Sequence, residues 1–361
     1  MSESMGENRN ENRNENSSEN LENTVPAAEV FPLKQERNFC SGLGLCYAIF
    51  IAVTSAVQLA IGYAILQWAP GIIVNHFWLY MLVSMMPTYV IGFPILAKLC
   101  KNRPVVVLEE HKMRGGQFMA LLCMCYGVMV IGNILGIVVN GVIGIIKGSP
   151  VVNSINLMLG NSNLWVNILI AGICAPIFEE LMFRKFLVDR MVRYGEAVAV
   201  VVSGLMFGLF HGNFSQCFYA AFLGMLLAYA YVKTGKIKYP IFIHMIINLS
   251  NTLLLPVLQK IGTVDFVSLQ EQMLGGDSAA ALSEFAATLP YLIILVVYEI
   301  AFYGMAIAGV VLLIARRKRF TFKPGKVTIP KGKGVSVVWC NVGMLLFTLA
   351  CIALFVMNLR A

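Results

Sequence analysis

The sequence predicts an all-α protein, a polytopic membrane helix bundle with about eight or nine transmembrane helices. Two observations on composition support this fold class. Hydrophobic residues make up 58% of the 361 residues and charged residues only 13%, whereas soluble domains carry about 25% charged residues. The mean hydropathy is +0.75. A third observation is that the apolar residues gather in long segments, which must be helical because a bilayer offers no water to unpaired amides.

The lengths of the apolar segments predict which of them cross the membrane. A helix rises 1.5 Å per residue, so about 20 residues span the ~30 Å hydrocarbon core. The fifth and sixth segments are shorter than this, and the third is long enough to tilt, bend at a glycine or extend beyond the bilayer. In order, the segments are about 39–67, 76–98, 116–146, 163–183, 197–211, 215–232, 239–258, 290–315 and 335–358.

The chain divides into a polar tail and three membrane regions. Residues 1–38 repeat Glu-Asn-Arg-Asn and contain little apolar surface, so we predict a disordered cytoplasmic tail. The tail lacks the basic start and apolar core of a signal peptide. We assign residues 39–159 to N-terminal transmembrane helices and 160–258 to a core that carries the candidate site. Residues 259–361 form a C-terminal region with an acidic loop at 261–289, in which a surface helix is possible, and two further helices.

Basic residues alternate between successive loops, which predicts the orientation of the chain. Loops that face the cytoplasm are enriched in Lys and Arg. The alternation therefore predicts a cytoplasmic N-terminus, an external C-terminus and an integral protein of a bacterial plasma membrane. The net charge of +8 reflects this orientation, and no nucleic-acid partner is predicted. The basic loops are 98–114, 184–193, 233–238 and 316–333, and the intervening loops hold only Lys147, Lys260 and Arg360.

The cysteines indicate no chemistry of their own. Nine cysteines are scattered along the chain, mostly inside apolar segments, and no C-x-x-C pair occurs. We therefore predict neither a disulfide framework nor a thiolate zinc site. In apolar segments cysteine behaves as a small hydrophobic residue.

Two adjacent carboxylates, Glu179 and Glu180, end one of the apolar segments. An ionised carboxylate inside a bilayer costs at least ~2.5–3.5 kcal/mol, so such residues usually pair with a charge or serve a function. Glu180 and Arg184 are four residues apart, share one helix face and are predicted to pair. Glu179 points about 100° away from that face and has no such partner.

Two further helices carry polar residues that Glu179 could use. His211 ends the fifth segment, four residues after Phe207, and by itself is equally a packing or interfacial histidine. His244 and Asn248 share one face of the seventh segment, as interhelical hydrogen-bonding groups or as a site facing a cavity. Gly204, Gly208 and Gly212 lie four apart and predict a stripe where another helix approaches closely.

Taken together, these residues favour water activation. A carboxylate can act as general base and a histidine can aid proton transfer, and a His/Asn pair can donate hydrogen bonds to an oxyanion. Glu179, His211 and His244 are also candidate ligands for a divalent metal such as zinc, although the H-E-x-x-H motif is absent. A non-catalytic scaffold or a transporter that uses the same polar cluster for binding stays open as an alternative.

The motifs Glu179-Glu180-x-x-x-Arg184, Phe207-x-x-x-His211 and His244-x-x-x-Asn248 resemble those of the CPBP family of intramembrane proteases. That family includes type II CAAX prenyl endopeptidases and proteins linked to bacteriocin immunity. The resemblance covers about residues 160–255. It implies that Glu179 activates water with His211, that His244 and Asn248 stabilise the oxyanion, and that Glu180, Arg184 and Phe207 have supporting roles. Members have been described both as metalloproteases and as metal-free glutamate-dependent proteases.

The resulting hypothesis is an intramembrane endopeptidase that cleaves a membrane-anchored peptide or protein. One geometric tension accompanies it. If the membrane border lies near Arg193, Glu179 is 14 residues away, ~21 Å along a straight helix, whereas His244 is only ~9 Å past Lys238. Helix tilt, a break near Gly195 or an inner vestibule would reconcile the two depths.

Overall fold

The computed structural model describes residues 32–151, 158–275 and 278–360, and the regular elements in these ranges are helices. The predicted all-α class is therefore confirmed. Eight helical spans in the described chain are long and apolar enough to cross a membrane, and the helix Glu196–Phe210 is apolar but shorter. This agrees with the expected eight or nine spans.

The elements up to the candidate site pair long helices with short interruptions. In chain order they are α1 (Leu33–Trp68), α2 (Gly71–Asn75), α3 (Phe77–Pro87), the π-helical η1 (Thr88–Gly92), α4 (Phe93–Cys100), α5 (Gly115–Lys147), α7 (Leu164–Asn167), the π-helical η2 (Ile168–Cys174), α8 (Ala175–Glu180), the π-helical η3 (Leu181–Val188), α9 (Asp189–Met191) and the 3-10 turn η4 (Val192–Tyr194).

The remaining elements complete the bundle. They are α10 (Glu196–Phe210), α11 (Phe214–Thr234), α12 (Lys238–Gly262), α13 (Phe266–Gly275), α14 (Ser278–Ala315), the 3-10 turn η5 (Arg317–Arg319), α15 (Gly334–Val338) and α16 (Val342–Arg360). The predicted loop 261–289 is thus largely helical, because it contains α13 (Phe266–Gly275) and because α14 begins at Ser278, well before residue 290.

The first helix begins earlier than predicted. We expected the polar tail to extend to residue 38, and this boundary is wrong because α1 starts at Leu33. The reason is a buried anchor at Glu36, which is 3% exposed. Its carboxylate accepts a hydrogen bond from Tyr194 at 2.6 Å and pairs with Arg193 at 3.0 Å. Residues 1–31 of the predicted tail lie outside the described residues.

The sixth apolar segment also exceeds its predicted length. It forms α11, which has 21 residues and counts among the candidate spans. The helix includes Phe214 at its start and the polar residues Lys233 and Thr234 at its end. Asn213 caps the start by accepting a hydrogen bond from the amide of Gln216, and Gly235, with φ 63°, ends the helix in the left-handed conformation.

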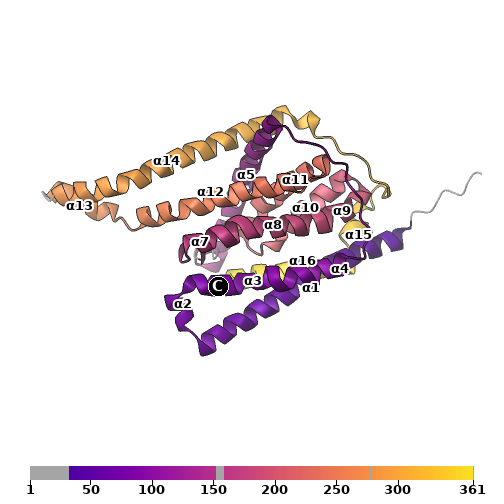
Figure 1. Ribbon diagram of the computed structural model, residues 1–361, viewed down its shortest axis with the longest axis horizontal. Helices are drawn as coiled ribbons and strands as arrows, with labels where there is room; N and C mark the ends of the chain where they lie inside the picture. Colours follow the sequence, from indigo (N-terminus) through magenta and orange to yellow (C-terminus); the bar gives the residue numbers. More distant parts are fainter. Residues whose placement is uncertain (1–31, 152–157, 276–277, 361) are drawn as a thin grey trace, which may run out of the picture. The chain divides into compact units, whose positions relative to one another are not determined.

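The basic loops meet at one end of the bundle (Figure 1, right). The amide of Val106 donates to the carbonyl of Asp189 at 2.7 Å, and that of His111 donates to Thr234 at 2.8 Å. The amide of Val327 donates to the carbonyl of Arg193 at 2.9 Å. These bonds join loops that are far apart in the sequence. The alternation of charge therefore corresponds to a real alternation of helix direction, and we call this region the basic end.

The opposite end brings together the loops that are poor in basic residues. Lys147, at the end of α5, donates to the carbonyl of Leu359 at 2.7 Å, and Gln259 of α12 bonds the carbonyl of Gly160. The ring of Phe214, at the start of α11, lies 4.6 Å from that of Phe355. Each long helix therefore runs from one end to the other.

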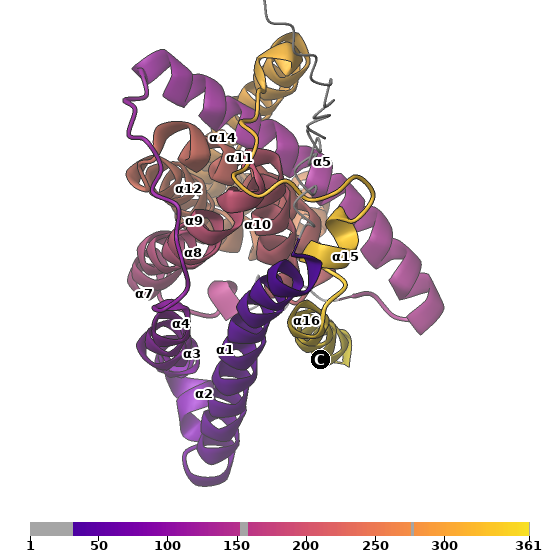
Figure 2. The ribbon, with the colours of Figure 1, turned by 90° about the vertical axis from the view of Figure 1, so that its right-hand side faces the viewer.

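The outer helices expose apolar side chains, as expected of surfaces that face lipid. On α14, Ile300 is 69% exposed and Ile307 67%, and on α5 Ile137 is 71% exposed. Monomeric soluble proteins rarely expose such long apolar stripes. Inside the bundle, α10 lies among α11, α9 and α16 (Figure 2).

Glycines allow α10 and α11 to approach each other closely, as predicted. A Cβ atom on Gly204 would lie 2.7 Å from the carbonyl oxygen of Ala221, and one on Gly208 would collide with the carbonyl of Cys217. Gly212 does not belong to this stripe, so that part of the prediction is wrong. It follows the end of α10 with φ 64° and packs against Leu354 of α16, because a glycine in the left-handed region commonly ends a helix.

Candidate active site

Glu179 and Glu180 lie in α8, a short α-helical stretch between two π-helical ones. π-helical turns are rare and often occur at functional sites. Pro176, in the first turn of α8, has no amide hydrogen to donate, which disturbs the regular ladder at this point. The span Leu164–Tyr194 is therefore irregular on both sides of its carboxylates.

Glu180 and Arg184 form a fully buried ion pair, as their spacing predicts. The Nε of Arg184 donates to Oε2 of Glu180 at 2.7 Å, and Nη2 donates to Oε1 at 3.1 Å. Both side chains are 0% exposed. The pair is bidentate, the geometry in which guanidinium and carboxylate interact most strongly. The third donor of Arg184, Nη1, reaches Ser203 Oγ at 2.6 Å.

Glu180 has a second partner, His244 on α12. The Nδ1 atom of His244 lies 3.1 Å from Oε1 of Glu180, and both side chains are buried. Because Arg184 keeps this carboxylate ionised, Glu180 can only accept hydrogen bonds. The hydrogen-bond network thus assigns a proton to Nδ1 of His244 and leaves Nε2 to face elsewhere.

The free nitrogen of His244 faces Glu179. Its Nε2 atom lies 3.8 Å from Oε2 of Glu179, which is beyond direct hydrogen-bond range. The Glu179 side chain is 14% exposed, whereas that of Glu180 is 0% exposed. Of the two adjacent carboxylates, the one without an arginine partner is therefore the more accessible, and it shares its surroundings with a histidine whose other nitrogen is held.

Phe207 separates the two histidines of the motifs. Its ring lies edge-on to both, with centroids 4.9 Å from His211 and 5.7 Å from His244. His211 caps the end of α10, and its Nδ1 lies 2.7 Å from the carbonyl oxygen of Phe207. A carbonyl can only accept, so Nδ1 of His211 carries the proton and Nε2 is left unprotonated in the neutral ring.

Asn248 is held one helical turn after His244. Its Nδ2 donates to the carbonyl of Ala171 at 2.9 Å, and Ala171 lies in η2, the π-helical stretch that precedes α8. One of the two amide hydrogens on Nδ2 is thereby used and the other is left over. Asn251, which follows on the same helix, is directed elsewhere and accepts a hydrogen bond from Tyr298 of α14 at 2.8 Å.

Glu179 and His244 lie close together in the structure, although the sequence predicted different depths in the membrane for them. Asp189 accepts a hydrogen bond from Tyr231, three residues before the end of α11, so the chain has already reached the basic end at Asp189. Counting from Asp189 shortens the depth of Glu179 to ~15 Å. The 3-10 turn Val192–Tyr194 then runs along this end and does not lengthen the span.

Ser203 is a member of the network that sequence reasoning missed. Its hydroxyl accepts from Arg184 and donates to the carbonyl of Phe183 at 3.1 Å. The signal was its spacing, since Ser203 precedes Phe207 by four residues and His211 by eight and so lies on the same face of α10. Serine in an apolar helix commonly bonds its own backbone, and only the fold shows that a buried arginine reaches it.

The side chains of the site do not converge as metal ligands do. Across residues 32–151, 158–275 and 278–360, no three His, Cys, Asp or Glu side chains are grouped closely enough to hold a metal ion. Glu179 and His244 face each other, whereas the nearest ring to His211 is Phe207. Among the described residues, the predicted ligand set Glu179, His211 and His244 does not form such a group.

Comparison with known proteins finds similarity to membrane proteases, and the matched family model covers this part of the chain. Residues 161–250 match the family model of type II CAAX prenyl endopeptidase Rce1-like proteins. The putative membrane peptidase YdiL of Bacillus subtilis is 29% identical over 82 residues, which are 22% of this chain and 34% of that protein. The membrane-embedded CAAX protease MroQ of Staphylococcus aureus is 29% identical over 130 residues, 34% of this chain and 51% of that protein.

These matches confirm the resemblance to CAAX-type membrane proteases, and the residues that match the family model include all three motifs. The match spans about a third of one curated relative and about half of the other. No solved structure matches the chain.

Proposed function

We propose that this protein is an intramembrane endopeptidase that hydrolyses a peptide bond of a membrane-associated peptide or protein. The observation that carries the proposal is the relationship of His244 to the two glutamates. Glu180 holds Nδ1 of His244, and Nε2 faces Glu179 across 3.8 Å. The similarity of residues 161–250 to CAAX-type proteases supports the same class of reaction.

In the proposed reaction, Glu179 acts as general base on a water molecule. Glu179 accepts a proton from the water, and the water oxygen attacks the carbonyl carbon of the substrate. Nε2 of His211 is a free acceptor that helps to hold this water. The carbonyl oxygen then carries the negative charge. Glu179 returns the proton to the leaving nitrogen as the C–N bond breaks, so that protons and charge balance over the cycle.

His244 and Asn248 are the proposed oxyanion donors. The second amide hydrogen of Asn248 is available because Ala171 uses only one. A protonated His244 donates from Nδ1 to Glu180 and from Nε2 to the oxyanion. Hydrogen-bond donors that are already oriented toward the developing negative charge usually contribute about 10²–10³-fold to the rate. The carbonyl of Ala171 holds Asn248 in place, and the carboxylate of Glu180 holds His244.

The proposed location is the cytoplasmic half of a bacterial plasma membrane. The basic end then faces the cytoplasm and the end with Lys147 and Leu359 faces outward. Labelling of single cysteines with a membrane-impermeant reagent in intact cells tests this orientation. A cysteine introduced at Ser149 is expected to react, and one introduced at Lys236 is expected to react only after the cells are opened.

The cleavage assay uses the full-length protein in liposomes with an internally quenched peptide that carries a lipid anchor. Glu179→Gln is expected to reduce turnover to background without loss of folded protein. Glu299→Gln is the matched control, because Glu299 is also a carboxylate within a candidate span but lies on α14, away from the site. Equal turnover by wild type and Glu179→Gln would exclude the proposed mechanism.

Two further arms separate the alternatives. Turnover that persists in a strong chelator is expected for the proposed chemistry, and a loss that added zinc restores would indicate a metalloprotease. If Glu179→Gln keeps the cellular role of the wild type, the protein acts by binding, as a scaffold or immunity protein.

A further inference from the structure

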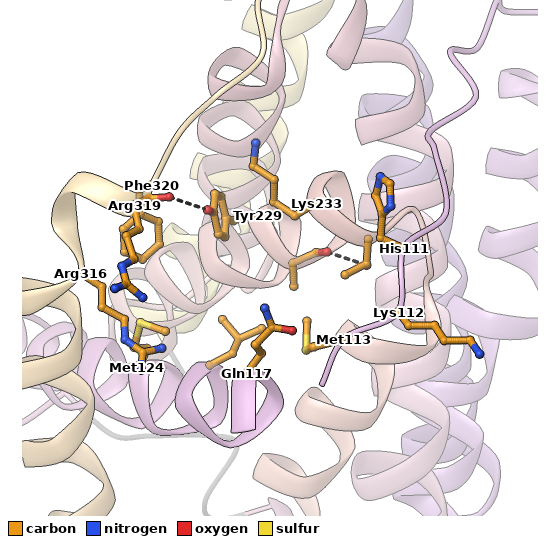
Figure 3. Close-up of a pocket in the computed structure, with 13 residues that line it drawn as sticks. His111, Lys112, Met113, Gln117, Met124, Tyr229, Lys233, Arg316, Arg319 and Phe320 are labelled. Carbon is orange, nitrogen blue, oxygen red and sulfur yellow. Dashed lines mark hydrogen bonds between the residues drawn. The ribbon is translucent and has the colours of Figure 1, made fainter. Parts of the chain in front are cut away.

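A cavity of about 370 Å³ opens at the basic end, away from the candidate active site. It lies between the loop after α4, the start of α5, the last turns of α11 and the end of α14 (Figure 3). Cavities of about 300–1,000 Å³ are the usual size for small-molecule sites. Its position at the junction of four segments makes it a candidate binding site that the protease chemistry does not use.

The rim of this cavity is cationic. Arg316 and Arg319 line one side of the opening, and Lys112 lies on the opposite side with its side chain directed outward (Figure 3). None of the described residues that line the cavity is an Asp or Glu. Among the described residues, neither guanidinium nor the Lys112 ammonium has a carboxylate partner. Lys233, which also lines the cavity, is paired with Glu196.

The floor of the cavity is apolar. Leu121 and Met124 of α5 and Ala230 of α11 line it, and all three belong to the buried core of the bundle. Leu121 is six residues into α5, ~9 Å from the start of that helix. The cavity thus reaches from the charged surface into the level of the apolar helices, which matches a ligand with a charged head and an apolar body.

We propose that this cavity binds the phosphate headgroup of an anionic phospholipid. Arginine is suited to this role because its planar guanidinium binds phosphate oxygens in a bidentate manner. Basic pockets between transmembrane helices on the cytoplasmic side are known as sites for anionic lipid headgroups. The phosphate contacts Arg316 and Arg319, and the glycerol and first methylenes rest on Leu121 and Met124.

The proposal does not depend on the proposed protease activity, because neither Glu179 nor His244 lines the cavity. The proposal concerns which phospholipid the protein binds at this cavity. Phosphatidylcholine has a phosphate too, but its choline cation neutralises it, so the cavity discriminates by net charge.

The test uses full-length protein in a neutral detergent, titrated with phosphatidylglycerol or phosphatidylcholine, with bound lipids counted by native mass spectrometry. We expect one phosphatidylglycerol to bind with clear preference over phosphatidylcholine. Arg316→Gln/Arg319→Gln is expected to weaken that binding about 30-fold, the effect of two basic residues on an anionic lipid. The matched control is Arg317→Gln/Lys318→Gln, which removes the same charge from the same turn without touching the cavity and is expected to change binding less than about threefold.

Equal losses in the two double variants would overturn the proposal, since they would reveal diffuse surface attraction, and so would equal binding of the two lipids. Glycerol phosphate in the same titration identifies the source of the phosphate. Displacement of the lipid by an equal concentration of glycerol phosphate would overturn the lipid assignment in favour of a soluble phosphate ester.

Hydrogen exchange of the wild-type protein keeps the test decisive if the double variant does not fold. Phosphatidylglycerol is expected to slow amide exchange in residues 112–121 and 316–320 and to leave residues 331–338, which are also at the basic end, unchanged. Uniform slowing of all three segments, or of none, would contradict the proposal.

Discussion

Nδ1 of His244 lies 3.1 Å from Oε1 of Glu180, and this contact joins α8 and α12, the elements that carry the first and third motifs. It gives Glu180 two duties, since the same oxygen also accepts a hydrogen bond from Arg184. A carboxylate that is locked by an arginine can accept the Nδ1 hydrogen of a histidine and hold its ring in one orientation. Glu180 is therefore a positioning residue for His244 as well as the partner of Arg184.

Glu180→Gln is expected to reduce kcat about 10²-fold or more with little change in KM. The amide has no negative charge to orient and stabilise the protonated ring of His244 that the proposed reaction uses, and neutralising an orienting carboxylate is costly in comparable catalytic sites. The variant also leaves the Arg184 charge without its partner, so its melting temperature falls as well. The measurement is kcat and KM per folded molecule, from peptide cleavage and size-exclusion chromatography.

Glu196→Gln separates the two effects of that substitution. Glu196 is also a buried carboxylate paired with a basic side chain, Lys233, but it lies at the basic end. It is expected to lower the melting temperature and to leave kcat per folded molecule intact. If both variants lose the same activity per folded molecule, the positioning role of Glu180 is wrong.

Asn248→Ala is expected to lower kcat about 10²–10³-fold, because it removes a proposed oxyanion donor. KM is expected to change little, since the bond forms with the oxyanion and not with the substrate in its ground state. Asn251→Ala is the control, because Asn251 lies on the same helix and bonds Tyr298 of α14. Similar kcat values for the two variants would contradict the assignment of Asn248.

Gly208→Ala is expected to destabilise the packing of α10 on α11 by about 1–3 kcal/mol, the usual cost of overpacking. The new Cβ would collide with the carbonyl of Cys217, which is backbone and cannot rotate away. At Gly141 of α5 a Cβ meets nothing within 4 Å, so Gly141→Ala is expected to be neutral or to stabilise by up to about 1 kcal/mol. Thermal unfolding in detergent measures both, and equal shifts would show that the close approach is unimportant.

The loop between α4 and α5 is expected to loosen as the pH falls below about 4. A hydrogen bond from Lys236 lowers the pKa of Glu110, and one from Lys323 lowers the pKa of Glu109. A carboxyl group whose pKa is lowered on folding stabilises the fold above its unfolded pKa of about 4.3, and that contribution is lost as the pH falls through the lower, folded value. The Glu110 carboxylate also raises the pKa of Lys236, so this pair persists into alkaline solution.

Amide exchange of Val106 and His111, corrected for intrinsic rates, reports this loosening, because both amides tie the loop to other segments. The corrected exchange rate is expected to be slow and independent of pH near pH 7 and to rise below about pH 4. Glu110→Gln should exchange faster already at neutral pH and respond less to acid. An unchanged acid response in that variant would show that the pair with Lys236 does not hold the loop.

Much of the architecture followed from local patterns in the sequence. Composition predicts the helical spans, the placement of Lys and Arg predicts the alternation of the loops, and i,i+4 spacing predicts the pairing of Glu180 with Arg184. Each of these patterns can be read from residues that are close together in the sequence. The same patterns misjudged the ends of elements. Glu36 extends α1 because Arg193 and Tyr194 lie beside it, and Gly212 leaves the glycine stripe because α10 has already ended.

The sequence by itself determined that this is a helical membrane protein, and its motifs identified Glu179, His211, His244 and Asn248 as candidates. Only the tertiary structure decided how they are supported. The contact between Glu180 and His244, the hydroxyl that Ser203 offers to Arg184 and the cavity beside Arg316 each join segments that are far apart in the chain. Such contacts depend on how helices tilt and pack against one another, and no spacing within a single helix specifies that.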